Sequence, residues 1–227
     1  MIELASPKGR LIAAAMRLAD TRPWADITLI DIAEAAGVSL ADLKQSISSK
    51  PELIAAFMTA VDDAVVKTAV ARDNTQPARD RLFEVIMGRF DLLAPYKTAL
   101  KSIAAGRSAD PGLVRPFLAS QHWMLQAAGI GTDGAQGNMR VLGLGSLYAA
   151  IFQTWLNDDD PGMAKTMAAL DRRLRRGEQT LTTIEDTVSG VMRFASSLPG
   201  LVSTAFGRGR NSAEPGRGDV PPASTTM

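Results

Sequence analysis

Apolar residues recur at intervals of three and four along most of the chain, which is the spacing of one face of an α-helix. Proline, glycine and short polar clusters divide the chain into helix-sized segments. No segment alternates apolar and polar residues convincingly, as a half-buried strand would. The pattern predicts an all-α protein, with longer helices over about 7–22, 50–72, 78–94, 96–105, 113–128, 138–157, 163–176 and 179–198.

Three helix starts fall close together between residues 28 and 52. Thr28-x-x-Asp31, Ser39-x-x-Asp42 and Ser49-x-x-Glu52 fit the capping-box pattern, in which a hydroxyl and an acid satisfy free backbone N–H groups. Gly37 follows Ala36, where a left-handed residue that ends a helix is expected. The sequence therefore predicts two short helices, over about 28–36 and 39–47, before the longer one at residue 50.

The remaining breaks suggest how the chain is organised. Four glycines within residues 129–137 predict a mobile loop. The apolar stripe from Leu181 to Val202 fits a dimer seam, packing on the body or a membrane-lying helix, and its few basic residues favour the first two. We expect a head over 1–55, a helical body over 56–206 and a disordered tail over 207–227.

Composition removes several classes of chemistry. The 227 residues include no cysteine and one histidine, so disulfides, thiolate nucleophiles and cysteine zinc sites are excluded. No serine or acid near His122 suggests a triad, so we expect no enzyme, no metal site and no cofactor. The first ten residues lack the apolar core of a signal peptide. The longest apolar run, 141–152, is too short to span a membrane, and we expect a soluble cytoplasmic protein.

Residues 28–47 have the pattern of a helix-turn-helix. Ile32 and Ala33 face inward on the first helix, residues 36–38 form the turn, and Leu43 and Ile47 pack back from the second helix. The opposite side of the second helix then faces outward, where it can enter a major groove. That side carries Leu40, Asp42, Lys44, Gln45 and Ser46.

The order and spacing of these residues resemble the N-terminal domain of TetR-type transcriptional regulators. The resemblance covers about residues 8–60 and includes Arg10-Leu-Ile-Ala-Ala-Ala, Thr28-x-x-Asp31-Ile32-Ala33-x-x-Ala36-Gly37-Val38-Ser39 and Ser49-Lys50-x-x-Leu53. It implies an all-helical homodimer that binds palindromic operator DNA, in most cases as a repressor released by a ligand in the body. It also implies a set of DNA contacts at Thr28, Ser39, Leu40, Lys44, Gln45, Ser46 and Lys50.

The recognition helix departs from the family pattern, and the charge of the head is unfavourable for DNA. Lys44 and Ile47 stand where the family usually has Tyr and Phe. Residues 1–55 hold six basic and seven acidic side chains, for a net charge of −1, and Asp42 lies on the reading helix. Phosphate contacts supply most non-specific affinity. Two interpretations therefore stay open: operator binding, or a helix-turn-helix kept only as a scaffold.

A second resemblance covers about residues 78–175. Arg81-Leu-Phe, Arg89-Phe-Asp-Leu-Leu, Tyr148 and Trp155-Leu-Asn-Asp are similar to the TetR-fold accessory protein of ubiquinone biosynthesis. That resemblance implies a lipid-binding body, no DNA contact and peripheral docking on a membrane. It is the alternative to the regulator.

Large apolar side chains of the body are candidates for a ligand pocket, because such pockets are mostly apolar and often contain methionine. We expect a small apolar or lipid-like effector. The candidates are Phe83, Met87, Phe90, Met124, Tyr148, Phe152 and Trp155, with Met139 and Leu142 beside them. Four arginines at 172, 173, 175 and 176 span too much of a turn for one face, and we expect them in solvent or paired with acids at 158–160.

Overall fold

The computed structural model describes residues 6–68, 75–105 and 110–177. All of these belong to one compact unit, and none forms a strand, so the all-α prediction is confirmed. The α-helices are α1 (Pro7–Thr21), α2 (Leu29–Ala36), α3 (Leu40–Ser46), α4 (Lys50–Thr68), α5 (Ala78–Leu93), α6 (Lys97–Ala105), α7 (Val114–Ala127) and α8 (Gly134–Leu156), and a further helix covers 164–177.

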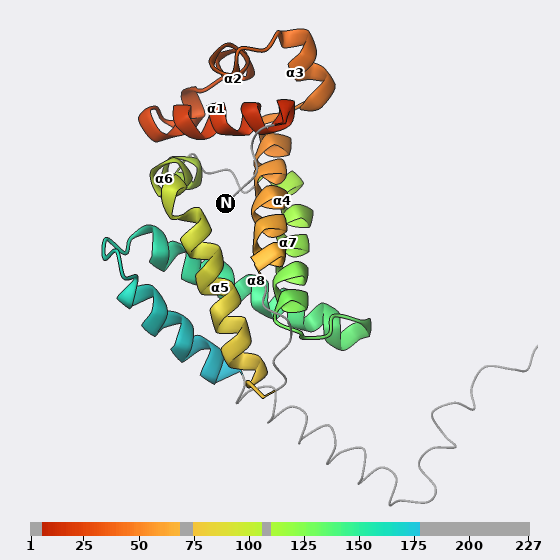
Figure 1. Cartoon of the computed structure of the whole chain (residues 1–227), viewed down its shortest axis with the longest axis vertical. Coiled ribbons are helices and arrows are strands. Elements are labelled where there is room, and N and C mark those ends of the chain that lie inside the picture. Colours follow the sequence, from red (N-terminus) through yellow and green to blue (C-terminus); the bar gives the residue numbers. More distant parts are fainter. Residues whose placement is uncertain (1–5, 69–74, 106–109, 178–227) are drawn as a thin grey trace, which may run out of the picture. The chain divides into compact units, whose positions relative to one another are not determined.

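Helices α1, α2 and α3 gather around the N-terminal end of α4, and α4 continues from them into the body beside α7 (Figure 1). Ser6 begins α1 by accepting a hydrogen bond from the Gly9 N–H at 3.0 Å, and Pro7 occupies the first turn, where its missing N–H costs nothing. Helix α1 also packs against α6. The predicted division into head and body lies inside this one unit and stays a prediction.

Proline marks the turn between α5 and α6, as predicted. Pro95 lies in a 3₁₀ turn, η2 (Ala94–Tyr96), after which the chain continues as α6. Two further 3₁₀ turns are η1 (Trp24–Asp26) and η3 (Pro111–Leu113). The predicted stripe over 181–202 and the predicted tail over 207–227 lie outside the described residues. The described residues include no helix with the length and hydropathy of a membrane span.

The predicted loop over 129–137 is wrong in its second half, because α8 begins at Gly134. The surroundings of Gly137 explain why this position of the helix is a glycine. A Cβ atom built there would lie 2.0 Å from the Thr132 carbonyl carbon, so the start of α8 packs directly against the preceding loop. Gly137 therefore allows close backbone packing inside a helix and does not mark a loop.

A buried ion pair joins α4 to the body. The Arg89 guanidinium of α5 donates to the Asp62 carboxylate of α4, to the Tyr148 hydroxyl at 3.1 Å and to the Ser120 hydroxyl at 3.4 Å. Ser120 in turn donates to Asp62 at 2.6 Å. Burial acts to lower the pKa of Arg89, but Tyr148 and Asp62 raise it above its ordinary value, so the guanidinium is charged at every accessible pH. Four helices thus meet at one polar cluster.

Breaking this pair is expected to destabilise the protein strongly. Arg89→Met leaves a buried carboxylate without its charge partner, which costs about 3–5 kcal/mol of unfolding free energy. Asp62→Asn leaves the opposite charge unpaired and has a similar effect. Urea titrations followed by circular dichroism measure both. If the free energy of unfolding falls in the double variant by as much as the two single decreases added together, the side chains do not act as a pair.

Two glycines of α8 give opposite predictions for the same substitution. Gly137→Ala forces a Cβ into the Thr132 backbone and is expected to cost about 1–3 kcal/mol. Gly143→Ala, exposed and with no atom within 4 Å of the new Cβ, is expected to stabilise the helix by about 0.5–1 kcal/mol. Thermal melts that rank the two variants equally would contradict this account of the start of α8.

Candidate nucleic-acid interface

The turn between α2 and α3 is built around Gly37. Its φ of +66° is left-handed, a conformation that glycine adopts without steric cost. The Gly37 N–H donates to the Glu34 carbonyl at 3.1 Å and the Val38 N–H to the Ala33 carbonyl at 3.0 Å. These bonds end α2 and turn the chain sharply into Ser39, as the sequence predicts.

Helix α3 has one buried and one exposed side. Leu43 and Ile47 are 2% and 1% exposed and pack into the core of the head, as predicted. Leu40 is 53% exposed, and Ser39, Lys44 and Gln45 are also exposed, whereas Ser46 is half-buried. The predicted contact residues of α3 therefore lie on the side opposite its packing face, although Ser46 is less accessible than the others.

The three helix starts use their hydroxyl and acid pairs in three ways. Thr28 and Asp31 form the full capping box that the sequence predicts. Ser39 accepts from the Asp42 N–H at 3.1 Å, but the Asp42 carboxylate accepts from the Ser39 hydroxyl instead of the backbone. Before α4, the Ser49 hydroxyl accepts from the Glu52 N–H at 3.2 Å, as predicted, but the Glu52 carboxylate accepts from the N–H and hydroxyl of Ser48 instead of Ser49.

Lys50 is engaged within the head. Its ammonium donates to the carbonyl oxygens of Trp24 and Ile27, at 2.5 and 2.7 Å, and lies 4.5 Å from the centre of the Trp24 ring. Burial lowers the pKa of this lysine. In this conformation Lys50 holds η1 against the start of α4, and a phosphate contact requires these bonds to be exchanged.

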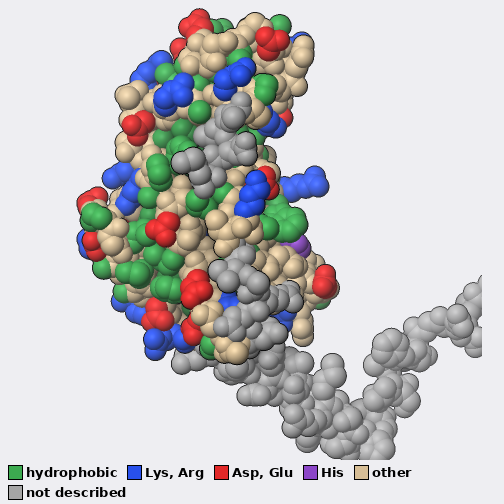
Figure 2. Space-filling model, viewed as in Figure 1, with side chains coloured by type: hydrophobic (Ala, Val, Ile, Leu, Met, Phe, Trp, Pro, Cys, Tyr) green, Lys and Arg blue, Asp and Glu red, His purple; other side chains and the backbone are tan. Residues whose placement is uncertain are grey.

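Three other basic side chains of the head differ in whether they form hydrogen bonds or ion pairs within the described structure. Arg17 donates to the Ala35 carbonyl at 3.2 Å, and Arg22 donates to the Asp26 carbonyl and lies 3.6 Å from the Asp31 carboxylate. Lys44 has no hydrogen-bond or ion-pair partner among the described residues. Figure 2 shows basic and acidic groups intermixed on one face of the head. The Lys44 ammonium, on the exposed side of α3, can therefore meet a phosphate without giving up a bond within the head.

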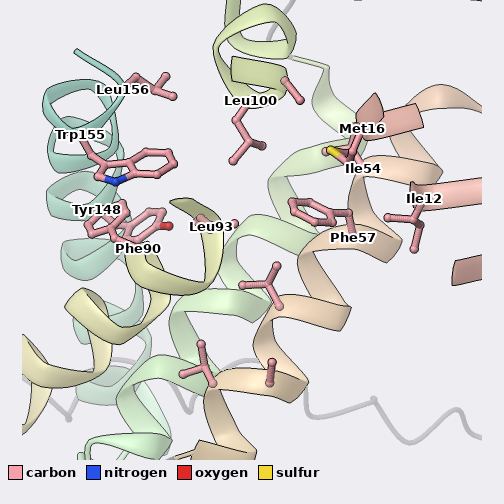
Figure 3. Close-up of a cluster of buried hydrophobic side chains, with 14 of the residues drawn as sticks. Ile12, Met16, Ile54, Phe57, Phe90, Leu93, Leu100, Tyr148, Trp155 and Leu156 are labelled. Atoms are coloured by element: carbon pink, nitrogen blue, oxygen red, sulfur yellow. The ribbon is translucent and has the colours of Figure 1, made fainter. Parts of the chain in front are cut away.

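Four of the seven candidate pocket residues of the body pack together in an aromatic cluster. The Phe90 ring stacks on those of Tyr148 and Trp155, with centroids 5.5 and 5.2 Å apart (Figure 3). The centroid of the Phe152 ring lies 6.1 Å from that of Tyr148. Phe83 and Met87 are half-buried on α5, and Met124 is buried on α7. Met139 and Leu142, in contrast, are 65% and 58% exposed on α8.

Sequence reasoning missed the polar groups inside this apolar body. Asp62 and Arg89 lie within helical stripes of apolar residues, and Gln121 is fully buried with its Oε1 atom unpartnered among the described residues. A charged residue at a buried position of a predicted stripe was the available signal for the first two. The sequence held no comparable signal for Gln121.

Solved structures share this arrangement of helices. The chain is similar to the crystal structure of a TetR transcriptional regulator from Nitrosomonas europaea ATCC 19718, with a TM-score of 0.59 and 23% identity over 74% of this chain and 96% of the other. A TetR transcriptional regulator from Rhodococcus sp. RHA1 gives a TM-score of 0.56 and 19% identity, over 74% and 93%.

No protein-family model and no curated protein matches the chain. At these identities the structural likeness establishes the fold. The chain is an all-helical protein with a helix-turn-helix near its N-terminus. Its fold is that of the TetR transcriptional regulators, as the sequence resemblance predicts.

The capping acids predict that the head loses stability in acid. The backbone and hydroxyl bonds from Thr28 lower the pKa of Asp31, and those from Ser48 lower the pKa of Glu52. The folded state therefore holds these carboxylates ionised more strongly than the unfolded state does. Their contribution is complete above the unfolded pKa values and is lost as the pH falls through about 5 to 3. In thermal melts between about pH 7 and 3, the melting temperature of Asp31→Asn should fall less steeply with decreasing pH than that of the parent. An unchanged decline would show that this cap does not govern it.

Proposed function

We propose that this protein is a DNA-binding transcriptional regulator in which α3 enters the major groove. The observation that carries the proposal is the two-sided α3: Leu43 and Ile47 anchor it, while Lys44 and Gln45 face solvent on the other side. Gln side chains bond adenine bidentately, and a lysine ammonium meets phosphate or guanine. The shared fold with TetR transcriptional regulators supports the same role.

The electrostatics of the head predict weak, salt-sensitive binding by a single chain. Its net charge is −1, and Arg17, Arg22 and Lys50 are engaged internally. Two acids of the helix-turn-helix have their charge partly offset, because Asp31 lies near Arg22 and Asp42 lies at the start of its own helix. Few phosphate contacts per chain make two linked heads necessary for useful affinity.

We assign the remaining roles on that basis. The protein acts as a cytoplasmic homodimer on a palindromic operator, as a repressor released by a small apolar effector, and it is not an enzyme. Exposed Met139 and Leu142 on α8 supply an apolar surface that a second copy would cover. The aromatic cluster around Phe90 and Tyr148 supplies the apolar surroundings that such an effector requires.

Selection from a random duplex pool at low salt tests the DNA proposal. We expect a palindromic site to be enriched. Lys44→Ala is expected to weaken binding to every duplex and to lower the salt slope by about one per chain, since one phosphate contact is lost. Gln45→Ala is expected to relax the preference at one base pair of each half-site by about 1–3 kcal/mol. Lys67→Ala, at the far end of α4, is the matched control.

No enrichment at micromolar protein would contradict the regulator. The lipid-binding alternative then predicts an isoprenoid or acyl lipid that copurifies with the protein and is detected by native mass spectrometry. A clean mass of the free chain would remove that alternative as well.

The dimer is tested by placing charges on α8. Met139→Asp combined with Leu142→Asp is expected to give a monomer of about half the parent's mass by light scattering, and to abolish binding to the palindrome while leaving the helical content unchanged. A pair of variants that still elutes at the parent's mass would show that another surface joins the copies.

A further inference from the structure

Four basic side chains line a hollow near the C-terminal end of the described chain. Lys165, Arg172, Arg173 and Arg176 line it from the helix over 164–177, and Thr154 lines it from α8. The cavity volume is about 530 Å³. That size falls within the range of small-molecule sites.

The helical repeat explains how these cations come together. Positions seven, eight and eleven residues after Lys165 return to the same side of an α-helix with 3.6 residues per turn. The four arginines do not all share one face and all are exposed, as expected, but three of them line this hollow together. The fourth, Arg175, is bonded instead to Asp171 on its own helix at 2.9–3.0 Å. Ala168 and Ala169 lie between the cations, and their short side chains leave the space open.

No acidic residue is among the described residues that line this hollow. Among the described residues, Arg172 and Arg173 have no ion-pair partner. Two of the three acids at 158–160 are bonded elsewhere: Asp158 accepts bonds from Thr166, and Asp160 accepts from the N–H groups of Gly162 and Ala164. Cations that line one hollow favour an anion between them.

We infer that this hollow binds a small polyanion, meaning a molecule with several neighbouring anionic oxygens such as a diphosphate or a tricarboxylate. Arginine recognises both groups, because its planar fork donates two parallel hydrogen bonds to paired oxygens. The site differs in chemistry from the apolar effector proposed above and lies on other elements than α3. It therefore stands independently of DNA binding.

Isothermal titration calorimetry of the full chain with inorganic pyrophosphate, and separately with citrate, tests this inference. The parent is expected to bind at least one of the two with one site per chain. Arg172→Ala combined with Arg173→Ala is expected to weaken that binding by about tenfold or more, since each arginine supplies charge-assisted bonds. Arg175→Ala removes one positive charge from the same helix outside the hollow and is expected to bind like the parent, whereas Arg172→Ala alone, which removes the same charge from inside it, is expected to bind more weakly.

Equal weakening by Arg175→Ala would show that only general surface charge is measured, and absence of binding by the parent would also overturn the inference. Lys165→Ala provides a second variant of the same rim should the double variant fold poorly by circular dichroism. Sedimentation with phosphatidylglycerol vesicles separates the two sources of phosphate. Vesicle binding that requires Arg172 and Arg173, without binding of pyrophosphate or citrate, would assign the surface to lipid headgroups and contradict a small-molecule site.

Discussion

The structure depends on the ion pair between Asp62 and Arg89. Helix α4 begins in the head at Lys50 and carries Asp62 three turns further on, where α5, α7 and α8 contribute the other members of the cluster. An isolated charge in such a place costs several kcal/mol. Any movement of α4 along its axis must therefore carry Arg89 with it or give both groups new partners. Because α4 is also the helix on which the head packs, this constraint links the position of α3 to the packing of the body.

The head is held together by polar bonds that occupy several of the groups assigned to DNA contact in the proposed function. Thr28, Ser39 and Ser48 are bonded to acids at helix starts, and Lys50 is bonded to backbone carbonyls. These bonds satisfy backbone groups that would otherwise be unpaired at the ends of short helices. They leave Lys44 as the cation on α3 that meets solvent. A head arranged in this way favours selective contact with a few groups over strong general attraction to phosphate.

Much of this could be predicted from local patterns. Gly37, the hydroxyl and acid pairs and the spacing of Leu43 and Ile47 are short-range signals, and the structure confirms the turn and the faces they define. Long-range contacts could not be predicted in this way. The start of α8 depends on how Gly137 meets Thr132, which its glycine-rich sequence alone does not reveal. The Arg89 cluster and the basic hollow join residues from different helices, and the inward direction of Lys50 is decided by carbonyls 23 and 26 residues earlier.

Amide hydrogen–deuterium exchange of the full chain, with and without a duplex that it selects, tests most directly the claim that α3 is the part that meets DNA. The account predicts slower exchange in peptides that cover residues 37–46 on adding DNA, and little change in peptides from the middle of α5. Bound DNA that leaves exchange over 37–46 unaltered, while protecting another surface, would contradict it.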